Sequence, residues 1–239
     1  MKKLLLSTLF IVTFCAISTI SASAAHNGAV KVGLRYGSTA LFSANLENAV
    51  GEGYEFGYYD EDREFVPLGE TRETTISMTA AGDIYMSESG VYSRDIPSGG
   101  YRSLEGWHVQ LEETYRDFDD AADAARDCGG WPAWIDGEYA VRTGCYGSRS
   151  DAEDEARALR GQAVRSSDTG VLVTVTKTND ILFEFDDGGD CWLGVRPVSW
   201  GGGTETWFKG YRYAGGFEYR RAGGGDLSVI NVVDLVDYV

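Results

Sequence analysis

The chain has 239 residues, of which 43% are hydrophobic, 13% aromatic and 24% charged. This composition excludes a disordered chain, a collagen and a multi-pass membrane protein, and 31 Gly with 4 Pro favour short strands joined by turns. The formal charge of −16 argues against nucleic acid or an anionic membrane surface as a partner, because both require clustered basic residues. A partner is expected to be neutral or cationic.

Residues 1–24 have the pattern of a secretory signal peptide. Lys2 and Lys3 precede an apolar run from Leu4 to Ile20, and small residues at 22–24 supply a cleavage site. The run is interrupted by Ser and Thr and is shorter than the about 20 apolar residues of a membrane anchor. We therefore expect cleavage near Ala24, a secreted, extracellular or cell-wall location, and no membrane attachment afterwards.

Residues 25–104 are predicted to form a β-rich N-terminal region. Apolar residues alternate with other residues over 30–35, the period-two pattern of a half-buried strand. Further strands are predicted at Tyr54–Tyr59, Phe65–Leu68, Thr74–Thr79 and Ile84–Ser87. The acidic run at 60–63 is predicted to be a hairpin tip, because it lacks the alternating aspartates of a calcium loop.

Residues 105–178 contain an internal repeat with an offset of 31 residues. Tyr115 maps onto Tyr146, and Asp117 and Ser148 are equivalent N-cap residues, each followed by an apolar helical stripe. Strands are predicted at Trp107–Leu111, Trp131–Ile135, Tyr139–Thr143 and Val171–Thr176, and helices at 118–128 and 152–163. The order is therefore βαββαβ, in an α+β fold that is rich in strands. Because two helices cover one face of four strands, the other face is predicted to be an open binding surface.

This segment resembles a SPOR domain, a module that binds bacterial septal peptidoglycan stripped of its stem peptides. The matching stretches are WHVQ at 107–110, with Tyr115 after it, and VRTGCY at 141–146. The resemblance implies a ferredoxin-like fold and glycan contacts by Gln110, Tyr115, Arg142 and Tyr146, with Trp131 and Trp134 as further candidates. For each aromatic residue the alternative is a place in the core. RNA-recognition modules share the element order but need basic residues, so the acidic, exported segment excludes nucleic acid.

Three cysteines remain after loss of the signal peptide: Cys128, Cys145 and Cys191. Export permits a disulfide, and Cys128 with Cys145 is the better pair because both fall in one compact segment. Three unpaired thiols are the alternative. No cluster of Cys and His predicts a metal site, and no motif predicts a cofactor.

Residues 179–239 return to strands, predicted at Ile181–Phe185, Cys191–Val195, Glu205–Tyr213, Gly216–Arg221 and Leu227–Val233. The stretches TWFKGYRY at 206–213, GFEYRR at 216–221 and LSVINVVDLVDYV at 227–239 resemble the opening of a SpoIID/LytB (amidase-enhancer) domain. In that family a catalytic Glu follows this opening. We therefore expect the natural protein to continue past Val239, and we assign no catalytic residue to this chain.

These patterns predict a secreted bacterial cell-wall protein that binds peptidoglycan glycan strands and supports wall remodelling in sporulation or division. A cell-wall amidase is a candidate partner. One alternative is a lytic transglycosylase, formed by the full-length protein. Another is an exported β-rich surface protein without glycan affinity.

Overall fold

The computed structural model describes residues 28–89, 91–104, 106–198, 203–221 and 223–238. Strands make up 52% of it and helices 14%, which confirms a strand-rich α+β fold. The predicted signal peptide lies outside the described residues. Within the described ranges, no helix has the length and apolar character needed to cross a membrane.

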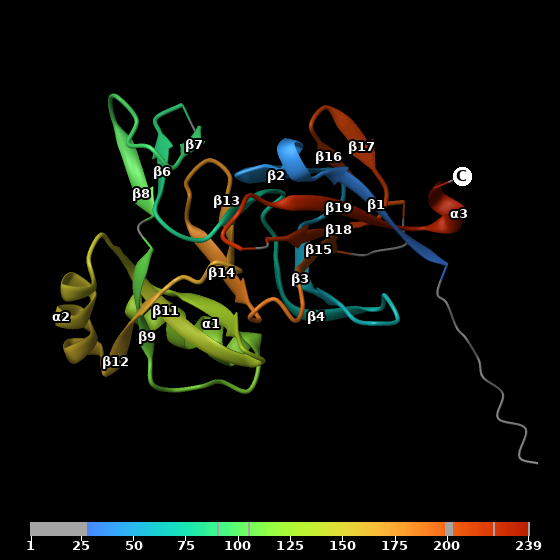
Figure 1. The fold of residues 1–239 in the computed structure, drawn as a ribbon. Coiled ribbons are helices and arrows are strands. Elements are labelled where there is room, and N and C mark those ends of the chain that lie inside the picture. The colour runs from blue at the N-terminus through green and yellow to red at the C-terminus, as the bar shows by residue number, and fades with distance from the viewer. Residues whose placement is uncertain (1–27, 90, 105, 199–202, 222, 239) are drawn as a thin grey trace, which may run out of the picture.

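One sheet joins the two ends of the described chain. Its six strands are, in spatial order, β1 (Ala29–Arg35), β19 (Ser228–Asp234), β18 (Gly216–Arg220), β15 (Leu193–Pro197), β3 (Tyr54–Tyr59) and β4 (Phe65–Thr71). All neighbours are antiparallel, and Ala29 pairs with Asp234. A short helix, α3 (Leu235–Tyr238), follows β19 at the same side of the molecule (Figure 1).

A second sheet collects strands from all three predicted segments. Its ten strands are, in spatial order, β12 (Gly161–Arg165), β9 (Trp107–Leu111), β11 (Glu138–Tyr146), β10 (Trp131–Ile135), β14 (Ile181–Asp186), β13 (Val171–Val175), β5 (Thr75–Ala80), β2 (Ser43–Val50), β16 (Glu205–Phe208) and β17 (Tyr211–Tyr213). The pair β10–β14 is parallel and the other neighbours are antiparallel. The three segments therefore fold against one another through shared hydrogen bonds.

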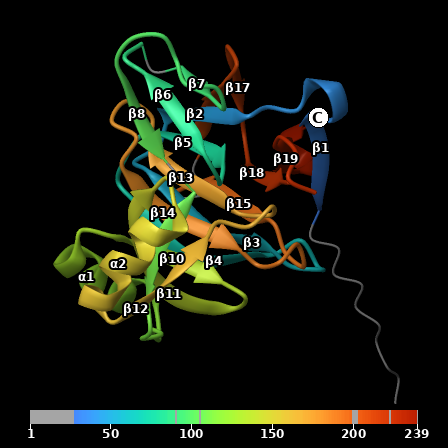
Figure 2. The same ribbon diagram turned by 60° about the vertical axis from the view of Figure 1, so that its left-hand side comes forward.

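A third, three-stranded sheet stands beside these layers. It consists of β7 (Tyr92–Ser93), β6 (Ile84–Ser87) and β8 (Tyr101–Leu104). Figures 1 and 2 show it projecting above the end of the molecule where the two main helices lie. Ile84 and Leu104 bury their side chains against Leu172 of β13, so this small sheet covers part of one face of the ten-stranded sheet.

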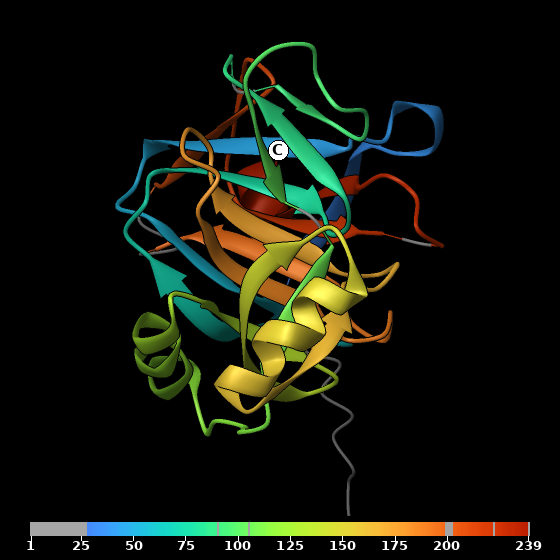
Figure 3. The same cartoon turned by 90° about the vertical axis from the view of Figure 1, so that its left-hand side faces the viewer.

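Both predicted helices form, and their N-caps are those read from the sequence. α1 (Phe118–Cys128) begins after Asp117, whose carboxylate accepts from the Asp120 amide, and α2 (Arg149–Leu159) begins after Ser148, which caps in the same way. The caps lie 31 residues apart, so the internal repeat is confirmed in the backbone. α1 packs on β10 and β11 and α2 on β9 and β12, and Figure 3 shows both at one end of the molecule.

The second helix is shorter than predicted. It ends at Leu159 because Arg160 adopts the left-handed conformation with φ 54°, and Ala163 lies in β12. β12 then pairs with β9, whereas the strand predicted for this place, Val171–Thr176, becomes β13 and pairs with β5 and β14. The sequence-based prediction missed this stop because the apolar stripe was continued through Gly161, the residue directly after the C-cap, to Ala163.

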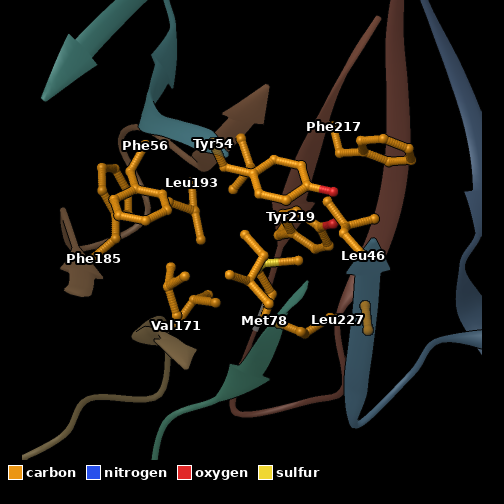
Figure 4. Close-up of a cluster of buried hydrophobic side chains, with 14 of the residues drawn as sticks. Leu46, Tyr54, Phe56, Met78, Val171, Phe185, Leu193, Phe217, Tyr219 and Leu227 are labelled. Atoms are coloured by element: carbon orange, nitrogen blue, oxygen red, sulfur yellow. The ribbon is translucent and has the colours of Figure 1, made fainter. Parts of the chain in front are cut away.

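The main core lies between the six-stranded and ten-stranded sheets. Side chains from strands of both sheets meet there, and Figure 4 shows Tyr54, Phe56, Leu193 and Tyr219 of one sheet with Met78 of the other. Farther along, the same face of the ten-stranded sheet is covered by the helices, where Val141 packs on Ala121 and Ala125. The ten-stranded sheet therefore has one apolar face, and its opposite face carries the polar residues.

Candidate functional site

Three of the predicted glycan contacts meet on the polar face of the ten-stranded sheet. Arg142 Nε donates to Gln110 Oε1 at 3.1 Å, and Arg142 and Trp131 both donate to the carboxylate of Glu184, at 2.6 and 3.2 Å. The period-two pattern thus placed these residues on the same face. The face is not open at this point, however, because Arg142 is 4% and Trp131 is 6% exposed.

Glu184 is the centre of a buried polar network. It is fully buried, and burial alone would raise its pKa, but the positive charge of Arg142 and the further contributions of His108, Trp131 and Ser166 together outweigh this effect, so the pKa lies below its usual value. The hydrogen bonds that the Trp131 ring nitrogen and the Ser166 hydroxyl donate to Glu184 also lower its pKa. The network therefore holds an ionised carboxylate inside the sheet, neutralised by one arginine.

His108 belongs to the same network. Its Nδ1 lies 2.7 Å from the carbonyl oxygen of Gly144, which can only accept, so Nδ1 carries a proton. Burial lowers the pKa of His108, which favours the neutral ring and makes Nε2 an acceptor. Ser166 Oγ lies 2.9 Å from Nε2 and 3.2 Å from Glu184, so its single proton serves one of two acceptors at a time.

An open cleft of about 630 Å³ lies next to this network. Ser166 lines the cleft and is also part of the network, so the two features are in direct contact. The walls come from the β5–β6 turn, the end of β12 with the loop after it, the segment after β7 and the residue after β18. The lining residues are Phe42, Ala80, Ala81, Gly82, Asp83, Ile84, Arg94, Arg165, Ser166, Ser167, Asp168 and Arg221.

Cations predominate in the cleft of an otherwise acidic chain. Three arginines and two aspartates line it, although the whole sequence has 37 acidic and 21 basic residues. Arg94 pairs with Asp226 at 2.9 Å and lies over the ring of Phe42, 4.9 Å from its centroid. Arg165 pairs with Asp83 at 3.3 Å. The third arginine, Arg221, is 5% exposed and bonds to backbone carbonyls.

The loop that forms the floor of the cleft is fixed by its own polar groups. Ser167 Oγ accepts from the amides of Thr169 and Gly170 at 3.0 and 3.1 Å, and Thr169 donates to Asp186 at 2.7 Å. The Gly170 carbonyl accepts from both the Ala81 amide and Arg221. These bonds tie the loop after β12 to the β5–β6 turn, which holds the cleft in one shape.

The other three predicted contacts lie elsewhere. Tyr115 and Trp134 line a separate hollow of about 220 Å³, where the Trp134 ring meets Tyr139 edge-on at 4.8 Å. Trp134 also packs against the main core. Tyr146 lies at the end of β11, where it pairs with Trp107. The six predicted residues therefore do not form a single surface.

The predicted disulfide between Cys128 and Cys145 is absent, because Cys128 is a free thiol. Its side chain packs with Ala121, Ala125 and Val141 beneath α1. Cys145 packs with the cluster of Ile84, Leu104 and Leu172 on the opposite face of the sheet. The error has a simple cause, since closeness in sequence did not show that the sheet separates the two side chains.

Sequence reasoning missed the cleft residues themselves. Arg165, Ser166 and Asp168 carry no motif, Arg221 was noted only as the end of the GFEYRR stretch, and the spacing from 168 to 221 gives no sign that they meet. Within the ranges that the structure describes, no group of three or more His, Cys, Asp or Glu residues is arranged to hold a metal ion.

Comparison with protein-family models, with curated proteins and with solved structures finds no match.

Proposed function

We propose that this chain is a secreted bacterial cell-wall protein that binds the glycan strands of peptidoglycan, and that its βαββαβ unit is of the ferredoxin-like, SPOR type. The connectivity supports the second part. Strands β9, β10, β11 and β12 lie in the order β12-β9-β11-β10 with every neighbour antiparallel, and both helices pack on one face. This is the strand order of a ferredoxin-like unit.

The cleft at the end of β12 carries the proposal of glycan binding. Its volume of about 630 Å³ lies within the range of small-molecule sites, about 300–1,000 Å³. Its lining offers guanidinium donors, carboxylate acceptors and serine hydroxyls, which suit the hydroxyl and amide groups of a sugar. We thus move the proposed glycan contacts from the covered residues Arg142 and Trp131 to the cleft beside them.

The C-terminal resemblance to a SpoIID/LytB opening supports the proposed setting. Such a protein would be exported by its signal peptide and would support wall remodelling in sporulation or division, with a cell-wall amidase as the candidate partner.

Co-sedimentation with purified peptidoglycan tests the proposal. The chain without residues 1–24 is mixed with peptidoglycan before and after an amidase has removed the stem peptides, and the bound fraction is measured. We expect retention, strongest on the stripped glycan. The Asp168→Asn variant should reduce it several-fold, because Asp168 is an exposed acceptor in the cleft.

Asp119→Asn is the matched control, since Asp119 is an exposed aspartate in the first turn of α1, away from the cleft. It should bind as the unchanged chain does. Absence of retention on either form of peptidoglycan would contradict glycan binding and favour a surface protein without glycan affinity. Equal loss in both variants would contradict the assignment to the cleft.

A further inference from the structure

Arg221 is a buried cation without a carboxylate partner at ion-pair distance among the described residues. Its Nη1 donates to the carbonyl oxygens of Ser167 and Gly170, both at 3.0 Å, and its Nε donates to that of Gly225 at 3.2 Å. Carbonyl groups supply only partial negative charge, so the full charge of the guanidinium is not neutralised there. Burial of a charge in this state is costly, and an anion that reached the group would be held strongly.

One nitrogen of this guanidinium, Nη2, is left over by these bonds among the described residues. Arg221 lines the cleft, and its Nη2 donates to no acceptor among the residues that the structure describes. Arg94 and Arg165 line the same space. Burial and the positive charge of Arg94 lower the pKa of Arg221, while Asp168 opposes them. The three cations thus line a single hollow.

The aspartates of the cleft limit the charge of the ligand. Asp226 pairs with Arg94 and Asp83 pairs with Arg165, so Arg221 is the arginine of the cleft that has no ion pair among the described residues. A dianion such as a phosphate monoester would meet the repulsion of these aspartates and of Asp168, whereas a single carboxylate matches the one unpaired guanidinium. The aspartates and Ser166 can then accept from, or donate to, neighbouring hydroxyl groups.

We infer that the cleft binds an acidic saccharide, with the sugar carboxylate at Arg221 Nη2 and the sugar hydroxyls at Asp168 and Ser166. The inference rests on the proposed function in that it takes a glycan as the ligand. It adds that the cleft recognises the charge of that glycan. The shape of the site is preset, because the same guanidinium that receives the anion also fastens the loop 166–170 through its other nitrogens.

A pair of probes that differ in one charge tests this inference. One is the disaccharide of N-acetylglucosamine and N-acetylmuramic acid with its carboxylate free, and the other is the same disaccharide with a carboxamide in its place. Isothermal titration at low ionic strength should give a dissociation constant roughly tenfold lower for the carboxylate, the size of a charge-assisted hydrogen bond. Raising the salt concentration should reduce this ratio.

Two variants identify the group responsible. Arg221→Met removes the buried cation, and its fold is checked by circular dichroism, because the change also removes anchors of the loop. Arg165→Gln removes a cation that is exposed at the edge of the cleft and disturbs no buried group. Both should lower the preference for the carboxylate, Arg221→Met to near equality. Arg157→Gln, an exposed arginine of α2 paired with Asp154, should leave it unchanged.

Each outcome separates the inference from the proposal on which it rests. Equal affinity for the two disaccharides would overturn charge recognition and leave glycan binding in place. Binding of neither would overturn both. A preference that persists in Arg165→Gln and in folded Arg221→Met would show that the carboxylate binds elsewhere. Acetate alone is the last arm: if it competes at the affinity of the acidic disaccharide, the site binds small anions and not a saccharide.

Discussion

Two buried arginines of this protein have different surroundings. Arg142, 4% exposed, is held by the fully buried carboxylate of Glu184 at 2.6 Å and by Gln110. Arg221, 5% exposed, has three carbonyl contacts and faces an open cleft. One charge is neutralised within the protein, and the other is left for a neighbour that the chain itself does not supply.

The difference separates a structural role from a binding role. A closed network such as that of Glu184 contributes little net stability compared with apolar packing. Removal of one partner, however, greatly lowers the free energy of unfolding, because the other charge is then buried without a partner. A buried cation without a counter-charge at a cleft lowers the stability of the fold slightly, but it stays available to bind a ligand. The sequence-based assignment gave the binding role to Arg142, and we propose Arg221 for that role because Arg142 is buried and already paired.

Removal of Glu184 should produce the largest effect on folding. Glu184→Gln leaves Arg142 buried without a counter-charge, and we expect the free energy of unfolding to fall by about 3–5 kcal/mol. Urea unfolding, with an unchanged slope against urea concentration, gives the value. Asp168→Asn, beside Arg221, should change stability by less than about 0.5 kcal/mol because Asp168 is exposed. Similar losses in the two variants would break the distinction between the two arginines.

The pH dependence of stability should show a smaller effect from the same network. Burial lowers the pKa of His108 below its ordinary 6.5, and Glu184 only partly opposes this. In the unfolded chain His108 takes up a proton as the pH falls below 6.5, while in the folded chain it stays neutral until its lower pKa is reached. Stability should therefore decrease between about pH 7 and 5, by at most about 1.4 kcal/mol per pH unit.

The variant His108→Gln isolates this contribution, and thermal unfolding across that pH range measures it. The variant should be less stable at pH 7 but should lose less on acidification. Glu184, whose pKa is lowered, adds its own loss only at lower pH, as the pH falls from its ordinary 4.5 towards its folded value. A variant that keeps the full slope from pH 7 to 5 would contradict a buried, neutral His108.

Local signals in the sequence were sufficient for most elements. The strands at Tyr54–Tyr59 and Ile84–Ser87 were predicted at their observed bounds, and α1 and its cap Asp117 were predicted from the apolar stripe and the capping residue. These features depend on neighbours within a few positions. The stop of α2 at Arg160 was missed because the left-handed conformation falls on an arginine and Gly161, which follows it, was taken as part of the helix.

The site was less accessible because long-range pairing creates it. His108, Ser166 and Glu184 come from three strands or loops separated by tens of residues, and β12 brings Ser166 to His108 only by pairing with β9. The resemblance to a SPOR domain named both Gln110 and Arg142, and the two side chains do meet on one face of the sheet. It could not show that the small sheet of β6, β7 and β8 and the rest of the chain would cover that face.

The buried hydroxyl of Tyr219 is a third kind of polar group, and its removal should give the smallest effect. The Tyr219 hydroxyl lies in the main core (Figure 4) and has no hydrogen-bond partner among the described residues, and burial raises the pKa of Tyr219. Tyr219→Phe removes an unsatisfied group, so we expect stability to rise by up to about 1 kcal/mol.

Tyr139→Phe is the matched control, because the Tyr139 hydroxyl donates to the Leu68 carbonyl at 2.6 Å. It should lose about 1 kcal/mol in the same urea titration. The two tyrosines differ in whether the protein supplies a partner, as the two arginines do, but a hydroxyl sealed in the core has no cleft through which a ligand could reach it. If both variants lose stability equally, a buried water molecule must satisfy the Tyr219 hydroxyl. In that case the absence of a protein partner would not by itself indicate a binding site. It would do so only for a group that also lines a cleft, as Arg221 does.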